Sequence, residues 1–384
     1  MNIAFVFDDL TLQQVGVTNY VLALGRTLQN CGHNIFNLLH RRRDLCDEYF
    51  SIELPVSNTY NDSVSVNGLA KNILSDWRKL SFPIHFENLY TLRTLESDLS
   101  CLKLDLAVFS APWINTVRLP KALLVAGICL DVIPIEYALS TGYPIDFALQ
   151  HTSGFRRWLE LDVAILFISE ETKRRFNLIP FSQLTLKNSS SDVIPPIATN
   201  AGLLKTRIRR DRSILCLAAP FDPRKGLVAN QSTYKLIEPY FDEIKIFGRP
   251  RCDPSYVDRT LSMLGNKKTE WFLSPSDQVI ADIYSQSRYL LFPSDDEGLG
   301  LPIIDAQCHG CSVIIQDKEP MKSISLPGSA FIDQLESNLD ALIFEEGNSM
   351  SKAEALKKSA LNTFDSPINV NRWLNQMMSG LNKI

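Results

Sequence analysis

The sequence contains no apolar run of about 18 residues, the length that a transmembrane helix needs, so no membrane span is expected. It also lacks a basic excess, because 39 lysines and arginines stand against 43 aspartates and glutamates, for a net charge of -4. Dedicated nucleic-acid-binding proteins usually carry a strong basic excess, so no nucleic-acid partner is expected. The N-terminus lacks a basic leader, and residues 3–7 are predicted to form a first strand and not a signal peptide.

Metal-binding patterns are scarce as well. The chain has 8 cysteines, of which only Cys308 and Cys311 have a metal-like spacing. A structural zinc site needs about four converging ligands, and the sequence offers no second C-x-x-C or H-x-x-x-H pair. We therefore expect no metal, and free cysteines in a reducing cytoplasm. The length of 384 residues, with 45% hydrophobic and 21% charged residues, is typical of a soluble protein of two domains.

The most informative stretch is 289–316. An apolar run at 289–292 has strand length and ends at Pro293, which cannot continue a hydrogen-bonded ladder. A loop with two glycines follows, then Leu301 and Pro302 open a helix, and 312–315 is the next buried strand. A glycine-bearing loop that leads into a helix N-terminus is a natural site for an anion such as a diphosphate.

Two acidic residues flank the start of this helix. Glu297 lies in the loop and Asp305 about one turn into the helix, so both side chains can face one pocket. A structural interpretation is also open. Glu297 caps the helix and Asp305 interacts with the helix dipole, each contributing roughly 0.3–1 kcal/mol to the stability of the helix.

The whole string resembles the signature of the retaining GT-B glycosyltransferases of family 4, P-S-x-x-E-G-F-G-L-P-x-x-E-A-x-x-x-G-x-P-V-I. In this chain it reads P-S-D-D-E-G-L-G-L-P-I-I-D-A from Pro293 to Ala306. It departs from the signature at Leu299, at Asp305 (in place of the second Glu) and at Ser312. The resemblance implies that Glu297 contacts the donor sugar and Asp305 the ribose. It also implies that backbone amides hold the diphosphate, namely those of Gly298, Leu299, Gly300 and Leu301.

The N-terminal segment resembles the opening β-α-β unit of the same family. After the strand at 3–7, apolar residues at helical spacing predict a helix over 18–28 with Thr18 as its cap. The family pattern G-G-x-x-x-Y is matched by Gly16 and Tyr20, while Val15 replaces the first glycine. The resemblance places Gly16 near the donor phosphates or the acceptor.

A second site element follows the predicted strand at 123–130. Asp131 begins the segment D-V-I-P-I-E-Y, which resembles H-D-L-I-P-x-x-x-P-E-Y of many mannosyltransferases of family 4, although Leu130 replaces the histidine. Open α/β sheets bind ligands at the carboxyl ends of strands. Asp131 is therefore expected to orient the acceptor hydroxyl or the donor sugar, the alternative being a loop-capping aspartate. The segment favours a GDP-mannose-type donor. The basic run 173–175 fits either steering of an anionic acceptor or a solvated helix face.

The second half opens with a predicted strand at 213–219. Lys225 and Gly226 match the family pattern G-R-x-x-x-x-K-G, whose Arg and Lys neutralise the diphosphate. Pro220 stands where that Arg belongs, so Arg224 is the candidate substitute, since a guanidinium can grip a phosphate through two nitrogens. Three further residues resemble the family's base-binding turns: Gly248, Arg249 and Phe272.

The resemblance covers most of the chain and implies an α/β GT-B fold with two Rossmann-like doubly wound domains facing across a cleft. We predict an acceptor-binding domain at 1–200, a nucleotide-sugar-binding domain at 201–366, and a C-terminal helix at 367–384 that crosses back to the first domain. A basic linker suggests a peripheral contact with the inner face of a membrane. Its cations are Lys205, Arg207, Arg209, Arg210 and Arg212.

The implied activity is transfer of a hexose or deoxyhexose, with retention, from a nucleotide-diphosphate sugar to a glycan or lipid-linked acceptor in surface polysaccharide synthesis. The donor is a substrate, so no cofactor is expected. Glu297, Asp131 and Lys225 are the candidate catalytic residues. The alternative is a degenerate GT-B domain acting as a binding or scaffold partner, which Pro220 and the missing histidine favour. A hydrolase or epimerase is not favoured, because no histidine or carboxylate is evident that would activate water.

Overall fold

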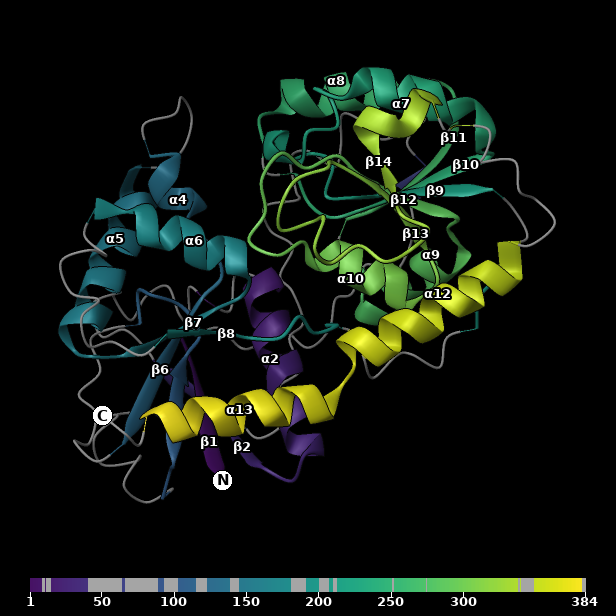
Figure 1. Ribbon diagram of the computed structural model, residues 1–384. Helices are drawn as coiled ribbons and strands as arrows, with labels where there is room; N and C mark the ends of the chain where they lie inside the picture. The colour runs from purple at the N-terminus through teal and green to yellow at the C-terminus, as the bar shows by residue number, and fades with distance from the viewer. Residues whose placement is uncertain are drawn as a thin grey trace. The chain divides into compact units, whose positions relative to one another are not determined.

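The chain forms two α/β units (Figure 1). The computed structural model describes residues 1–8, 11, 15–40, 64–65, 89–92, 103–114, 123–138, 145–180, 191–199, 207–209, 213–250, 252–273, 275–337, 339 and 349–381. The first unit comprises Met1–Glu53, Ile84–Thr199 and Ser366–Ile384. The second comprises Leu54–Pro83 and Asn200–Asp365.

The first unit is built on a parallel sheet with the strand order β4-β2-β1-β5-β6-β7-β8 in the described residues. Its central strand β1 pairs with β2 on one side and β5 on the other, and Ile3 to Phe7 are fully buried. Such a continuous apolar run is what a strand covered on both faces requires. The strands are β1 Asn2–Asp8, β2 Asn34–His40, β4 Leu89–Leu92, β5 Leu106–Phe109, β6 Leu124–Cys129, β7 Ala164–Phe167 and β8 Ser191–Val193.

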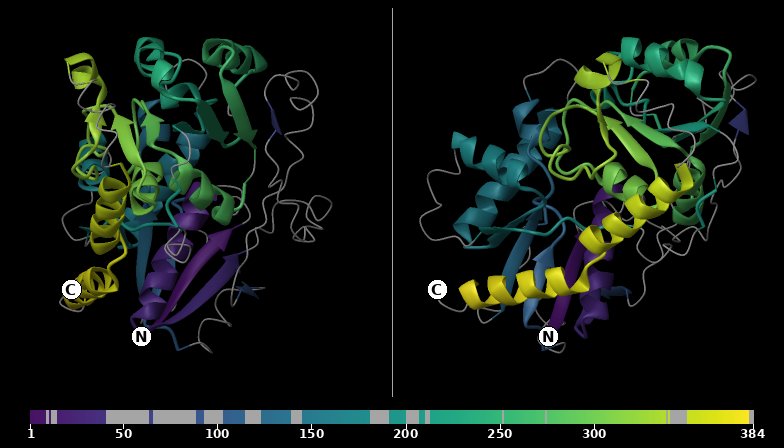
Figure 2. Two further views of the ribbon diagram at one scale, coloured as in Figure 1. Left: turned by 90° about the vertical axis from the view of Figure 1, so that its right-hand side faces the viewer. Right: turned by 45° about the vertical axis from the view of Figure 1, so that its right-hand side comes forward.

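Helices accompany this sheet. They are α2 Val15–Asn30, α4 Ile133–Glu136, α5 Ile145–Glu160, α6 Glu170–Leu178 and α13 Pro367–Leu381. Helix α2 begins three residues before Thr18, so the prediction that Thr18 caps it was wrong; the Thr18 hydroxyl instead donates to the carbonyl of Thr11 at 2.8 Å. The terminal helix α13 packs against α2 (Figure 2).

The second unit is also built on a mostly parallel sheet with helices. In the described residues its sheet order is β14-β13-β12-β9-β10-β11-β3, with every pair parallel except β11 and β3. Strand β3, Val64–Ser65, comes from within the predicted first domain and covers the edge of β11, whose backbone groups would otherwise be unpaired. The others are β9 Ile214–Ala218, β10 Glu243–Phe247, β11 Lys268–Phe272, β12 Tyr289–Phe292, β13 Ser312–Ile315 and β14 Ala330–Phe331.

The helices of the second unit begin at side-chain caps in two cases. Asp253 accepts from the amide of Tyr256 at the start of α8, and Ser276 accepts from that of Val279 at the start of α9. The α-helices are α7 Gln231–Ile237, α8 Pro254–Leu264, α9 Asp277–Gln286, α10 Leu301–Cys308 and α12 Ser349–Phe364. Three 3₁₀ turns are described as well, Pro223–Lys225, Glu238–Tyr240 and Ile332–Gln334.

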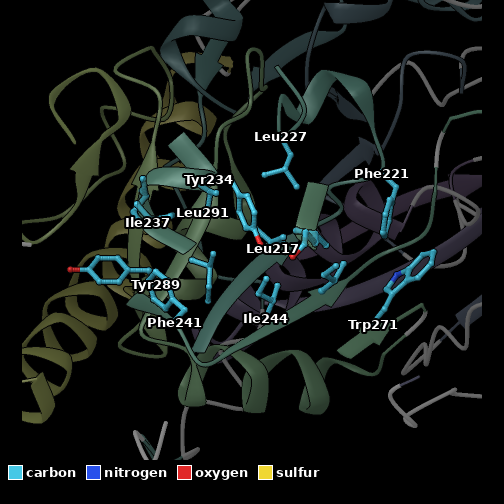
Figure 3. Packing of buried hydrophobic residues seen from close by; sticks show 14 of the residues in the cluster. Leu217, Phe221, Leu227, Tyr234, Ile237, Phe241, Ile244, Trp271, Tyr289 and Leu291 are labelled. Atoms are coloured by element: carbon cyan, nitrogen blue, oxygen red, sulfur yellow. Dashed lines mark hydrogen bonds between the residues drawn. The ribbon is translucent and has the colours of Figure 1, made fainter. Parts of the chain in front are cut away.

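One buried apolar cluster fixes the strands and helices of the second unit (Figure 3). Tyr234 and Ile237 of α7 lie over Leu217 of β9 and Leu291 of β12, and all four are at most 1% exposed. At the far end Phe221 packs on Trp271 with ring centroids 4.3 Å apart. Phe221 therefore anchors the segment between β9 and α7 to the buried cluster.

In the described strands, the order of each sheet reverses at one place. In the first unit this switch lies between β1 and β5, and in the second between β9 and β12. Open α/β sheets bind ligands outside the carboxyl ends of the strands at this place, because neighbouring loops diverge there to opposite faces. The predicted α/β class with two doubly wound sheets is confirmed. No helix in the described part of the chain is long and apolar enough to cross a membrane.

An aromatic cluster holds a histidine in the first unit. The ring of His151 on α5 contacts Phe147 and Trp113 edge-on, with centroids 4.3 and 5.1 Å away, and its Nδ1 lies 2.8 Å from the carbonyl oxygen of Phe147. Burial disfavours the charged imidazolium and lowers the pKa of His151 from 6.5 to about 4, although the Phe147 carbonyl opposes the shift.

This pKa predicts a pH dependence of stability. In the unfolded chain His151 binds a proton below about pH 6.5, whereas in the folded chain it stays neutral until about pH 4. Its contribution is therefore complete above pH 6.5 and is lost on acidification from 6.5 to 4, by about 3 kcal/mol. Denaturant unfolding of the wild type and His151→Phe at pH 7 and pH 4.5 measures this loss. Parallel stability curves for the two proteins would contradict it.

Candidate functional site

The strongest candidate site lies at the switch point of the second sheet. Strands β9 and β12 are parallel neighbours, so the turn after β9 and the loop after β12 leave the same edge. The first carries Arg224 and Lys225 in the 3₁₀ turn Pro223–Lys225, and the second carries Glu297. Residues 72 positions apart are thereby brought together.

An ion pair joins the two loops. The Nζ atom of Lys225 donates to Oε1 of Glu297 at 2.5 Å, and the side chains are only 13% and 10% exposed. The hydroxyl of Ser294, which is fully buried, donates to the same Oε1 at 2.5 Å. Lys225 also lies over the ring of Phe292, 4.8 Å from its centroid. Sequence reasoning found both charged residues but missed Ser294.

The backbones of the two loops touch as well. Gly226 ends the 3₁₀ turn with φ of 69°, and a Cβ at this position would lie 2.3 Å from the carbonyl oxygen of Pro293. The amide of Asp295 donates to the carbonyl of Arg224 at 3.2 Å. Only glycine permits this approach, so Gly226 has a packing reason to follow Lys225.

Arg224 lies beside the same loop. Its guanidinium donates to the carbonyl of Asp296 at 3.1 Å and lies 3.6 Å from the carboxylate of Asp222. Pro220, where the family signature has an arginine, is buried at the end of β9. Arg224 therefore places a second positive charge next to Lys225, although it stays a prediction that this charge meets a phosphate.

Helix α10 starts from the loop. Gly300 precedes it with φ of 95° and, as a glycine, offers no side chain to cap this end of the helix. The side chain of Leu299 is 3% exposed and packs inward, so its backbone alone is suited to a ligand. The first-turn amides carry the positive end of the helix dipole.

Asp305 lies within α10 and is 7% exposed. Its backbone carbonyl lies 2.8 Å from Nδ1 of His309. Burial, and second the Asp305 carboxylate, raise the pKa of the Cys308 thiol. The contact between Asp305 and a ribose stays a prediction. Within the described ranges no three histidine, cysteine or acidic side chains gather as a metal site would require.

The proposed base-binding residues lie at the carboxyl ends of β10 and β11. The amide of Gly248 donates to the carbonyl of Phe272 at 3.0 Å, and the indole of Trp271 donates to the carbonyl of Gly248 at 2.9 Å. Burial lowers the pKa of Arg249 to about 10, so its guanidinium stays protonated at neutral pH. These residues share the sheet edge of Lys225 and Glu297, and their contact with a base stays a prediction.

Gly16 and Asp131 belong to the first unit. Gly16 lies in the first turn of α2, is exposed, and has nothing within 4 Å of the place a Cβ would take. Asp131 follows β6 and is half-buried, and its backbone carbonyl accepts from the thiol of Cys129 at 3.7 Å. Burial, and second the Asp131 carboxylate, raise the pKa of Cys129. Both residues follow the carboxyl ends of strands of their sheet, the edge at which open α/β sheets bind ligands. Their contact with a ligand stays a prediction.

Two of the three basic residues at 173–175 on α6 pair with acidic side chains of the protein. Arg175 forms a bidentate pair with Glu136 at the end of the Asp131 segment, with one of the two contacts at 3.1 Å. Arg174 pairs with Glu171 at 2.7 Å. Arg175 thus fixes the position of α4, and the structure favours a structural role for it over steering of an acceptor.

The switch point of the first sheet holds a cluster that sequence reasoning did not select. Asp8 ends β1 and is fully buried; its Oδ1 accepts from the indole of Trp113 at 3.1 Å and from the hydroxyl of Thr11 at 2.6 Å. The position of Asp8 at the end of a predicted buried strand was the sequence feature that could have indicated this cluster.

The basic linker lies mostly outside the described residues. Of its cations, Arg207 and Arg209 are described, and the amide of Arg209 donates to the carbonyl of Ser285 at 3.0 Å. Ile208 between them is 2% exposed. The linker therefore packs on the second unit here, and a membrane contact stays a prediction.

Two glycine substitutions test the contact between the site loops. Gly226 and Gly328 have φ of 69° and 98°, and each lies in a turn, so alanine costs about 1–2 kcal/mol of backbone strain at either position. Only at Gly226 does the new Cβ meet another loop, so we expect Gly226→Ala to lower the free energy of unfolding by about 1–3 kcal/mol more than Gly328→Ala. Denaturant titration measures the difference. Equal costs would show that the loops separate freely.

Comparison with known proteins agrees with this architecture. No protein-family profile matches the chain. Stretches of 60 and 95 residues are 43% and 35% identical to serotype-specific mannosyltransferases WbdA of Escherichia coli, and cover 16% and 23% of this chain. The matched stretches span only 7% and 12% of the length of those relatives.

Solved structures match over the whole chain at low sequence identity. Sucrose-phosphate synthase of Thermosynechococcus elongatus covers 100% of this chain and 99% of its own, with a TM-score of 0.63 and 12% identity. HepE of Anabaena, solved with UDP and glucose, covers 99% of each chain, with a TM-score of 0.61 and 12% identity. WaaG, a glycosyltransferase involved in lipopolysaccharide biosynthesis, covers 98% of each, with a TM-score of 0.52 and 14% identity. The chain therefore has the GT-B fold of these glycosyltransferases.

Proposed function

We propose that this chain is a glycosyltransferase that moves a hexose or deoxyhexose from a nucleotide-diphosphate sugar to a glycan or lipid-linked acceptor, with retention, in surface polysaccharide synthesis. One observation carries the proposal: Lys225 and Glu297 meet at the switch point of a doubly wound sheet, beside the N-terminus of α10. A cation and helix amides suit a diphosphate, and a carboxylate next to them suits sugar hydroxyls.

The chemistry needs little from the protein beyond positioning and charge. The acceptor hydroxyl attacks the anomeric carbon as the bond from that carbon to the diphosphate oxygen breaks, and the departing diphosphate takes the proton of the hydroxyl. Lys225, Arg224 and the amides at the start of α10 stabilise the negative charge that develops on the diphosphate. Glu297 holds the sugar in the reactive orientation, and Asp131 orients the acceptor hydroxyl.

A GDP-mannose-type donor is the favoured substrate within this proposal. Its support is the segment that begins at Asp131, together with the short similarity to a mannosyltransferase. Uridine donors are the competing class, because the Anabaena protein of the same fold was solved with UDP and glucose.

A second candidate is a binding or scaffold domain that has lost catalysis. The buried Pro220 in place of the family arginine favours it, because one of the two diphosphate cations is then missing from its usual place. Arg224 on the next turn weighs against it, since its guanidinium lies beside the same loop.

A nucleotide panel decides between these functions. We expect one of GDP, UDP, dTDP or ADP at 100 times its dissociation constant to stabilise the protein by about 2.7 kcal/mol, which raises the melting temperature of a domain of this size by roughly 5–10 °C. The matching nucleotide sugar should then be turned over in the presence of an acceptor. No shift with any nucleotide contradicts the proposal, and binding without turnover favours the scaffold.

Glu297→Gln is the accompanying variant. It removes the carboxylate and should abolish the additional stabilisation by the sugar, while the bare nucleotide still binds. Glu243→Gln is the matched control, because Glu243 is also buried and also paired with a lysine, Lys268 at 2.8 Å, but at the opposite edge of the same sheet. Equal effects of the two variants on sugar recognition would remove Glu297 from the site.

A further inference from the structure

The carboxylate of Glu297 has two oxygens with different surroundings. Oε1 accepts from both Lys225 and Ser294, each at 2.5 Å. No described residue donates to Oε2, and the side chain keeps 10% of its surface accessible. The two donors thus use one oxygen and leave the other for a ligand.

Ser294 is well placed to control this arrangement. It is the second residue after β12, is fully buried, and its Oγ also lies 3.4 Å from the carbonyls of Arg224 and Asp296. Its hydroxyl therefore sits among backbone groups of both loops and has little freedom to move. A hydroxyl that donates to a carboxylate forms a short, charge-assisted bond, roughly twice as strong as a neutral one.

Lys225 alone would not define the orientation of the carboxylate. An ammonium is a compact charge with three rotatable donors, so it attracts either carboxylate oxygen from a range of directions. The hydroxyl of Ser294 comes from the loop that carries Glu297 itself, three residues earlier, and so fixes which oxygen turns inward.

We propose that Ser294 is a positioning residue that binds Oε1 of Glu297 and thereby presents Oε2 to a hydroxyl of the donor sugar. This inference rests on the proposed function, because it requires a nucleotide sugar in the site. Ser294 would affect recognition of the sugar and not recognition of the nucleotide diphosphate. The diphosphate would be bound by Lys225 and the α10 amides.

The test uses the member of the panel GDP, UDP, dTDP and ADP that binds the wild type. It compares dissociation constants for this nucleoside diphosphate and for its sugar, for example GDP and GDP-mannose, by isothermal titration calorimetry on the full chain. We expect Ser294→Ala to weaken the nucleotide sugar by about tenfold, while the diphosphate changes less than about twofold. Ser294→Thr keeps the hydroxyl and should recover most of the sugar affinity.

Ser287→Ala is the matched control. Ser287 is also fully buried and donates to a backbone carbonyl, that of Ile283 at 2.7 Å, but it precedes β12 and so lies at the other edge of the sheet. It should leave both dissociation constants unchanged, and thermal melts of all variants report any general loss of stability.

The outcomes distinguish a failure of the proposed function from a failure of the role given to Ser294. If the wild type binds none of GDP, UDP, dTDP and ADP, the proposed function fails and this inference fails with it. If the wild type binds the pair, but Ser294→Ala weakens diphosphate and sugar equally or changes neither, the inference alone is overturned and Ser294 is a structural residue of the loop.

Discussion

The ion pair between Lys225 and Glu297 is the interaction on which the second unit's site depends. It joins the turn after β9 to the loop after β12, and both side chains are nearly buried. Breaking a buried pair by removing one partner leaves an uncompensated charge, at a cost of about 3–5 kcal/mol. The two loops are therefore constrained to stay together, which gives the site a defined shape.

Around this pair the fold supplies contacts that exclude other arrangements. Gly226 lets the turn approach the carbonyl of Pro293. Two hydrogen bonds join the loops, one from the Arg224 guanidinium to the carbonyl of Asp296 and one from the amide of Asp295 to the carbonyl of Arg224. The cluster below, with Phe221 on Trp271, anchors the same turn from the core. Packing and polar contacts thus converge on one short stretch of backbone, as preorganised electrostatic stabilisation requires.

The two units place their chemistry in the same topological position. In the described strands, the order reverses between β1 and β5 in one sheet and between β9 and β12 in the other, and a buried acid lies at each reversal. In the first unit this is Asp8, which holds Trp113 and Thr11, and in the second it is Glu297. The repeated architecture therefore places a buried acid at the same topological position in each unit.

The sequence by itself determined the α/β class and the β-loop-α-β unit at 289–315, because a continuous apolar run, a proline stop and a glycine-bearing loop are local signals. It also identified Glu297 and Lys225 as candidates through the resemblance of their motifs. Only the tertiary structure decided that they pair, that Ser294 shares the same carboxylate oxygen, and that Arg175 holds Glu136. The pairs Lys225–Glu297 and Arg175–Glu136 join segments that follow different strands, and parallel strands become neighbours only through long crossovers whose register no local pattern records. The contact of Ser294 with Glu297 lies within one loop, whose conformation depends on the packing of that loop against the turn after β9.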